Sequence, residues 1–218
     1  NRTRPFRLGH LTINLVEGDI AATKADALVT AINSGGMWFG GIDGVIQRAA
    51  GLMFHRQADA ARPLTHTKTV VAKKHGEHSG QFDDVVFVID DLEGPLSAVI
   101  IAALTAASDA GYKTISLPAM RAGVMLGNVE KDAGEVAHQT VVGFEAFAAA
   151  YTGSLTDVTL VVYNQPNVFD AFAHDLERTQ PDPATRIHMA QSTLAHAVAG
   201  CALFYTKTDQ KVCFLHAD

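Results

Sequence analysis

Two polar residues, Asn33 and Asp43, stand at the two ends of a glycine-rich loop. Without a Cβ, a glycine lets a phosphate approach the backbone N–H groups, and the start of a following helix adds a favourable dipole. An amide such as Asn33 can both donate to and accept from a sugar diol, whereas a carboxylate such as Asp43 can activate a water. The loop holds four glycines, more than one tight turn needs: Gly35, Gly36, Gly40 and Gly41. These residue types at this spacing predict a site that holds a phosphorylated sugar and acts on it.

The elements around this loop would place it at the edge of a sheet. The apolar run Ala27–Ile32 predicts a buried strand before it, and apolar residues at helical spacing predict a helix after it, within Asp43–Ala60. Further strands are expected at Leu11–Glu17, Thr69–Ala72, Val85–Asp90, Thr114–Leu117 and Val158–Tyr163, and further helices at Leu96–Ala110, Val129–Ala150 and Val168–Glu177. Because the strands are apolar on both faces and alternate with helices, we expect an α/β fold, a three-layer α/β/α sandwich with a mixed central sheet. Ligands in such folds bind beyond the carboxyl ends of the strands.

Composition excludes several classes of protein. The chain has 218 residues, of which 48% are hydrophobic and 18% charged, so a folded core is expected rather than disorder. A net charge of −6 without a dense Lys/Arg run argues against non-specific nucleic acid binding. No apolar run is long enough to predict a membrane span. Only two cysteines are present, too few for a disulfide framework, and we therefore expect a cytoplasmic protein.

The composition changes near the C-terminal end. Residues 178–183 contain Thr-Gln-Pro-Asp-Pro, which is typical of a linker. We therefore expect one domain over residues 1–177 and an extension over residues 178–218. The extension is expected to hold a weak helix, Ala184–Ala199, and a hairpin formed by Cys201–Thr206 and Lys211–His216 around Thr208-Asp209.

Four segments, taken together and in order, resemble the macro domain, an ADP-ribose-binding module. They are Gly18-Asp19-Ile20, Asp26–Asn33, Gly40-Gly41-Ile42-Asp43-Gly44-Val45-Ile46 with Ala49-Ala50-Gly51, and Leu117–Val124. They are similar to the family's Gly-Asp-Ile, Asp-Ala-Ile-Val-Asn-Ala-Ala-Asn, Gly-Gly-Val-Asp-Gly-Ala-Ile with Ala-Ala-Gly, and Phe-Pro-Ala-Ile-Ser-Thr-Gly-Val. The resemblance covers about residues 6–177, and it implies the family's fold.

The resemblance also implies roles for individual residues. Asp19 would accept a hydrogen bond from the adenine amine beside Ile20, and Asn33 would hold the distal ribose. Asp43 matches the aspartate that hydrolytic, MacroD-type members use near that ribose. The remaining ligand-binding residues implied by the resemblance are Gly40, Gly41 and Ile42 in the first loop, Ala122, Gly123, Val124 and Met125 in the second loop, and Tyr163 as a ring for adenine to stack on.

The implied activity is removal of mono-ADP-ribose from modified protein side chains, with ester-linked acidic residues as substrates and Asp43 and Asn33 as catalytic residues. ADP-ribose or an ADP-ribosylated protein is the expected partner, and no cofactor or metal is expected. Three alternatives stay open: a non-catalytic ADP-ribose reader, a hydrolase of small metabolites such as O-acetyl-ADP-ribose (a deacetylase) or a ribose phosphate ester, and a scaffold with a vestigial pocket whose C-terminal tail binds a partner. Met125-Leu126 replaces the aromatic residue that usually packs on the distal ribose, which favours the reader, whereas Asp43 favours an enzyme.

Other chemistry-bearing residues receive a less specific interpretation. Arg121 stands where the family has a small hydroxyl residue, and it could pair with a phosphate or lie on the surface beside the loop. Trp38-Phe39 could stack on a base or form a flap over the site. His75 and His78 lie in a polar Gly/Ser-rich loop without a nearby cysteine, which indicates solvated histidines rather than a metal site.

Overall fold

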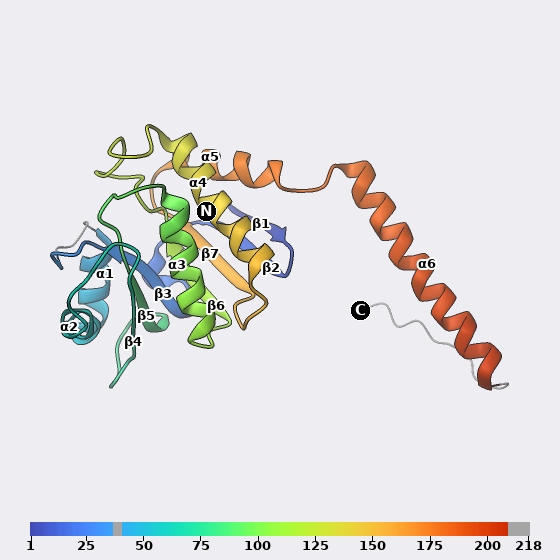
Figure 1. Cartoon of the computed structure of the whole chain (residues 1–218), viewed down its shortest axis with the longest axis horizontal. Coiled ribbons are helices and arrows are strands. Elements are labelled where there is room, and N and C mark those ends of the chain that lie inside the picture. The colour runs from blue at the N-terminus through green and yellow to red at the C-terminus, as the bar shows by residue number, and fades with distance from the viewer. Residues whose placement is uncertain (37–40, 209–218) are drawn as a thin grey trace. The chain divides into compact units, whose positions relative to one another are not determined.

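The structure is a computed structural model that describes residues 1–36 and 41–208. The chain divides into two compact units, Asn1–Gln180 and Pro181–Asp218. The first unit contains one seven-stranded sheet in the order β1-β2-β7-β6-β3-β5-β4 (Figure 1). Its strands are β1 Thr3–Leu8, β2 Leu11–Glu17, β3 Ala25–Ile32, β4 Thr69–Ala72, β5 Phe82–Ile89, β6 Thr114–Pro118 and β7 Asp157–Val162.

The five central strands run parallel, and the two edge strands, β1 and β4, pair antiparallel to their neighbours. The carboxyl ends of β2, β7, β6, β3 and β5 therefore lie along one edge of the sheet. The residues that follow those strands are Gly18-Asp19, Tyr163, Ala119-Met120, Asn33 and Asp90. This edge collects the residues that the sequence singled out from distant parts of the chain.

Helices cover both faces of the sheet, so the expected three-layer α/β/α fold is confirmed. On one face lie α3 (Leu96–Asp109), α4 (Ala133–Ala150) and α5 (Pro166–Arg178), whose apolar sides form one core with the sheet. On the other face lie α1 (Gly41–Ala50) and α2 (Met53–Ala60) over a second, smaller core. A short 3₁₀ helix, η1 (Ile20–Ala22), follows β2.

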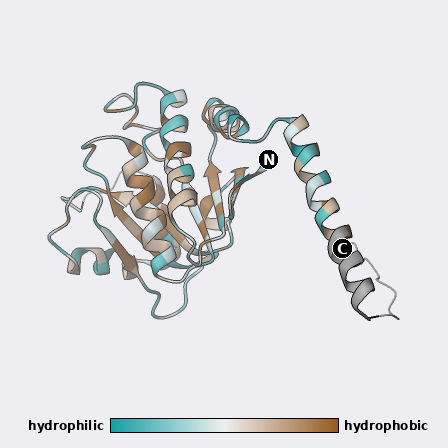
Figure 2. Cartoon of the chain, turned by 45° about the vertical axis from the view of Figure 1, so that its right-hand side comes forward, coloured by the Kyte–Doolittle hydropathy of each residue, from teal (hydrophilic) through white to brown (hydrophobic). Residues whose placement is uncertain are grey.

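The pleat of the strands explains the two cores. In β5, Val86 and Val88 join the core under α3, whereas Phe87 and Ile89 join the core under α2. A strand buried on both faces is apolar at most positions, which is the nearly continuous apolar pattern seen in the sequence. Figure 2 shows these strands as the most hydrophobic part of the first unit.

Three of the differences between the expected and the observed elements have a clear physical reason. The helix expected over Asp43–Ala60 is two helices, because Gly51 adopts φ +61° and ends α1. The helix expected from Val129 begins at Ala133, where Asp132 caps it by accepting a hydrogen bond from the Glu135 N–H. Strand β1 was not expected at all. It is an edge strand that carries Arg and Pro and exposes four of its six residues, which hides the apolar pattern.

In the described part of the second unit, residues 181–208, the chain forms a helix, α6, which runs over Pro183–Thr208. The weak helix expected at Ala184–Ala199 is part of it. The hairpin prediction is wrong for Cys201–Thr206, because these residues continue α6 as helix. The second strand of that hairpin, Lys211–His216, lies outside the described residues. Within the first unit, α5 ends at Arg178, one residue past the expected end of the domain.

Candidate functional site

A cavity of about 480 Å³ opens at the carboxyl edge of the sheet. Its volume falls in the range of small-molecule sites. Its walls come from η1, α1, the ends of β3, β6 and β7, the residues that follow β5, and the loop that follows β6. Nine of the twelve catalytic and ligand-binding residues predicted from the sequence line it: Asp19, Ile20, Gly41, Ile42, Asp43, Gly123, Val124, Met125 and Tyr163. Segments far apart in the sequence thus line one cavity.

The other three predicted site residues, Gly40, Asn33 and Ala122, are not part of the described lining. Gly40 lies outside the described residues, as do Trp38 and Phe39. Asn33 follows β3 as expected, but it is not part of the described lining of the cavity; its backbone carbonyl accepts the Gly36 N–H in the turn of the first loop. Ala122 is also absent from the described lining, because it is buried behind the loop and its carbonyl accepts a hydrogen bond from the Gln165 amide.

One end of the cavity, which we call the open end, consists of Asp19, Ile20 and Tyr163. The Asp19 carboxylate is exposed and accepts a hydrogen bond of 2.9 Å from the Ala21 N–H at the start of η1. Ile20 is buried beside it. Tyr163 follows the neighbouring strand β7 and is 73% exposed, so its ring is available for stacking. The open end therefore offers an acceptor, an apolar floor and an aromatic face, which suits a nucleobase.

The other end, which we call the buried end, is lined by Asp43, Asp90 and Arg121, and it includes His55, which is not in the described lining but is bound to Asp43. Asp43 lies in the first turn of α1 and is only 2% exposed, yet it lines the cavity. Its Oδ1 lies 2.9 Å from Nε2 of His55, which is 1% exposed on α2. The His55 ring in turn packs against Phe87 of β5. The Asp43 carboxylate is thus held by a buried partner at the cavity wall.

Sequence reasoning missed His55. It follows Asp43 by 12 residues, on a helix that was expected to be continuous with α1, so the turn that brings the two side chains together was not foreseen. Only the burial pattern of α2 could have suggested it, because Phe54, His55 and Ala58 face the core. The cavity lining also includes Arg48 of α1, which the sequence did not single out.

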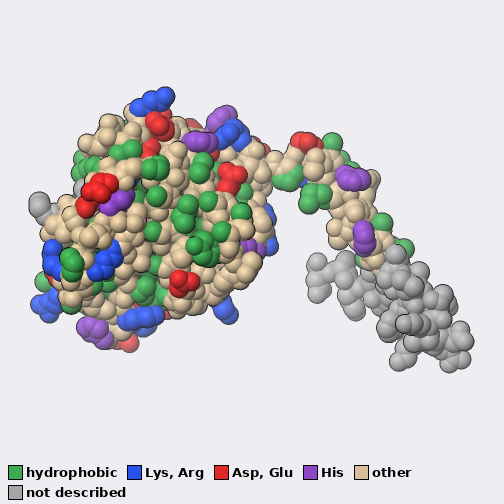
Figure 3. All heavy atoms as spheres, in the orientation of Figure 1, with side chains coloured by type: hydrophobic (Ala, Val, Ile, Leu, Met, Phe, Trp, Pro, Cys, Tyr) green, Lys and Arg blue, Asp and Glu red, His purple; other side chains and the backbone are tan. Residues whose placement is uncertain are grey.

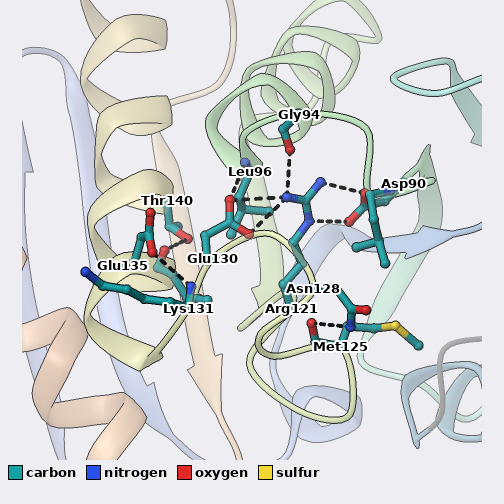
Figure 4. Close-up of polar contacts among 12 residues, drawn as sticks. Asp90, Gly94, Leu96, Arg121, Met125, Asn128, Glu130, Lys131, Glu135 and Thr140 are labelled. Carbon is teal, nitrogen blue, oxygen red and sulfur yellow. Dashed lines mark hydrogen bonds and ion pairs between the residues drawn. The ribbon is translucent and has the colours of Figure 1, made fainter.

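Arg121 differs from both interpretations that the sequence allowed. It is not on the surface, because it is only 6% exposed, and although it lines the cavity, each of its guanidinium nitrogens already donates to a protein oxygen (Figure 4). Nε and Nη2 bind the two oxygens of Asp90 at 2.9 and 2.8 Å, and Nη1 binds Glu130 at 3.0 Å. Burial opposes the charge, but the hydrogen bonds of Asp90 and Glu130 prevail and raise the pKa of Arg121 above its usual value.

The described residues show no metal site, no broad basic patch on the face drawn in Figure 3 and no membrane-spanning helix. Among the described residues, no three His, Cys, Asp or Glu side chains gather as a metal site. On the face drawn in Figure 3, Lys and Arg side chains of the first unit lie in separate small groups rather than in one basic patch. None of the helices described above combines the length and the apolar character needed to span a bilayer.

Sequence comparisons agree on one family. The pattern of the macro domain matches residues 29–136. A macro domain-containing protein of Streptomyces coelicolor is 29% identical over 172 residues, which cover 74% of this chain and 96% of that protein. An O-acetyl-ADP-ribose deacetylase of an Enterobacter species is 30% identical over 144 residues, which cover 61% of this chain and 78% of the enzyme.

Solved structures show the same fold at lower identity. A mutant of the Oceanobacillus iheyensis macrodomain superimposes with a TM-score of 0.65 at 15% identity, over 82% of this chain and 98% of the other. The Trypanosoma brucei macrodomain in complex with ADP-ribose gives a TM-score of 0.62 at 20% identity, over 73% of this chain and 67% of the other. At these identities the likeness concerns the fold.

Proposed function

The chain belongs to the macro domain family, and on the geometry of its cavity we propose that it binds ADP-ribose and hydrolyses mono-ADP-ribose from modified protein side chains. The observation that carries this proposal is that one cavity holds two carboxylates in different environments. Asp19 is exposed at the open end, whereas Asp43 is buried and held by His55 at the buried end. An exposed carboxylate such as Asp19 suits recognition of a ligand, whereas a buried carboxylate held by a partner, such as Asp43, suits catalysis.

The spacing of the strands supports an elongated ligand. Strands β7 and β6 separate β2 from β3, so with about 4.8 Å between strands the ends of β2 and β3 lie roughly 14 Å apart. We place adenine between Asp19 and Tyr163, next to β2 and β7. The distal ribose then lies near the ends of β3 and β5, beside Asn33 and Asp43. The diphosphate between them would meet the backbone N–H groups of Gly41 and Gly123, which need no side-chain cation.

Asp43 is the proposed general base. In hydrolysis of an ester-linked residue, water attacks the anomeric carbon, the bond from that carbon to the substrate's carboxylate oxygen breaks, and the carboxylate leaves. His55 engages Oδ1 of Asp43, which leaves Oδ2 to hold the water and take its proton. General base catalysis of this kind contributes about 10²–10⁴ in rate. Because His55 and Asp43 are both buried, their geometry is set before the substrate arrives.

Two alternatives use the same cavity. The Enterobacter relative and a similar one from Escherichia fergusonii are both named O-acetyl-ADP-ribose deacetylases, which favours a small acyl ester of ADP-ribose as substrate. A reader that binds without chemistry is favoured by Met125, which lines the cavity where an aromatic residue is usual. The buried Asp43–His55 pair argues against the reader, because a surface that only binds has no need of it.

An assay of ADP-ribose release distinguishes the proposed hydrolase from the deacetylase and from the reader. The protein is incubated with a carrier mono-ADP-ribosylated on acidic side chains and, separately, with O-acetyl-ADP-ribose, and free ADP-ribose is measured by chromatography. The proposal predicts release from the modified carrier. Release from O-acetyl-ADP-ribose alone would assign the deacetylase. Saturable ADP-ribose binding by calorimetry without release from either substrate would assign the reader.

A further inference from the structure

We propose that Arg121 is a positioning residue that fixes the second loop, residues 119–127, in the shape that receives the distal half of the ligand. This inference rests on the proposed binding of ADP-ribose. It concerns a residue at which the chain departs from the family pattern, since a small hydroxyl residue is usual there. Figure 4 shows the contacts of the Arg121 side chain with Asp90, Gly94 and Glu130.

Arg121 joins three separate segments of the chain. Through Asp90 it contacts the end of β5, through the Gly94 carbonyl, at 2.9 Å, it contacts the approach to α3, and through Glu130 it contacts the approach to α4. Asp90 is itself fixed, because its Oδ1 also accepts the Leu92 N–H. The guanidinium therefore ties the start of the second loop to the end of β5 and to the segments that precede α3 and α4.

Glu130 closes the same loop from its other end. Its side chain accepts from Arg121 and from the Leu96 N–H, at 2.8 Å, and its backbone carbonyl accepts the Gly127 N–H at 2.9 Å. Gly127 can take part because it adopts φ +92°, which favours glycine. Arg121 and Glu130 thus hold the first and last parts of the loop together. The residues between them, Gly123 to Met125, are the ones that line the cavity.

The backbone at Arg121 points to the same role. Arg121 has φ +60°, a left-handed conformation that costs a non-glycine residue of its size free energy. The surrounding ion pairs keep it in that conformation. Once Arg121 is removed, Asp90 and Glu130 would face each other's charge while buried, at 3% and 2% exposure. The loop would then be released from both ends.

The contacts of Arg121 predict how its contribution to ligand affinity depends on salt. If Arg121 bound a phosphate directly, its contribution to affinity would weaken as salt is added. A guanidinium whose nitrogens are engaged by buried protein oxygens acts through the loop backbone instead. The ratio of mutant to wild-type affinity should therefore stay constant with salt. The loss of affinity should be confined to ligands that contain the distal half of ADP-ribose, which the second loop receives.

The experiment compares adenosine and ADP-ribose as ligands of the full chain and its Arg121→Met variant by calorimetry, at low and high salt. We expect adenosine affinity to stay within about twofold and ADP-ribose affinity to fall by about tenfold or more, with the same ratio at both salt concentrations. Arg178→Met is the matched control, since Arg178 pairs with Asp175 on α5 and does not line the cavity. It should leave both affinities unchanged.

A second variant covers the case in which Arg121→Met does not fold. Asp90→Asn with Arg121→Met and Glu130→Gln removes every charge of the cluster together and leaves no uncompensated buried ion. It should keep the wild-type circular dichroism spectrum and show the same selective loss of ADP-ribose affinity.

Wild-type ADP-ribose affinity in a folded Arg121 variant would overturn the inference. So would an equal loss for both ligands, or a mutant-to-wild-type ratio that changes with salt. If the wild-type protein binds no ADP-ribose, the proposed function itself fails, and that outcome is visible before any variant is made.

Discussion

The open end and the buried end of the cavity hold their polar groups in opposite ways. At the open end, Asp19 is exposed with one backbone donor, and the Tyr163 ring is 73% exposed. At the buried end, Asp43 and His55 are 2% and 1% exposed and bind each other. Exposed groups can adapt to a ligand that enters from solvent, whereas buried pairs stay in one geometry. Under the proposed function, recognition and chemistry are therefore assigned to separate parts of the cavity.

The largest expected effect comes from the buried end. Asp43→Ala should lower the rate of ADP-ribose release by about 10²–10⁴, because the proposed base is gone, while ADP-ribose affinity stays within a few-fold. Release is measured by chromatography and affinity by calorimetry. Asp43→Asn is the matched control. It can keep a hydrogen bond to His55 but cannot take a proton, so it should release ADP-ribose as slowly as Asp43→Ala. Wild-type release by either variant would remove Asp43 from the mechanism.

Asp19→Ala should give the opposite result at the open end. Loss of a charged acceptor costs about 1.5–3 kcal/mol, so ADP-ribose affinity should fall by more than about tenfold. Turnover at saturating substrate should stay close to wild type. Asp109→Ala, at an exposed position in the last turn of α3, serves as control and should change neither quantity. If calorimetry finds unchanged affinity for Asp19→Ala, the residue does not belong to the site.

His55→Leu tests whether the buried partner matters to Asp43. Leucine removes the contact of 2.9 Å to Oδ1, and we expect release to slow by about tenfold with affinity almost unchanged. His55→Gln offers an amide donor from a side chain of similar reach, and it should recover part of the rate. Equal rates for the leucine and glutamine variants, at equal thermal stability, would show that His55 only fills space.

The smallest effect is expected from removing the second unit. A chain that ends at Gln180 keeps the hydrogen bonds between Gln180 and Arg7, and all described cavity residues precede this point. ADP-ribose affinity should stay within a few-fold of the full chain. Exposed apolar residues of α6 would be lost with it: Ile187, Met189, Leu194 and Val198. A folded 1–180 chain that no longer binds ADP-ribose would show that the second unit contributes to the site.

The fold and the open end could be predicted because their signals are local. Strands such as β3 and β5 are apolar at nearly every position, and the family segment Gly18-Asp19-Ile20 sits at a strand end. The buried end depends instead on pairs made by the fold. Arg121 meets Asp90 across 31 residues of sequence, and His55 meets Asp43 only because Gly51 ends α1. Residue type alone cannot tell a buried ion pair from a surface arginine.

Single-turnover release with protein in large excess over modified carrier tests the separation of the two ends most directly. Under these conditions weak binding is overcome by concentration, so the rate reports the chemical step. The account predicts that Asp19→Ala releases ADP-ribose at nearly the wild-type rate, whereas Asp43→Ala stays slower by about 10²-fold or more. An Asp19→Ala rate as slow as that of Asp43→Ala would contradict it.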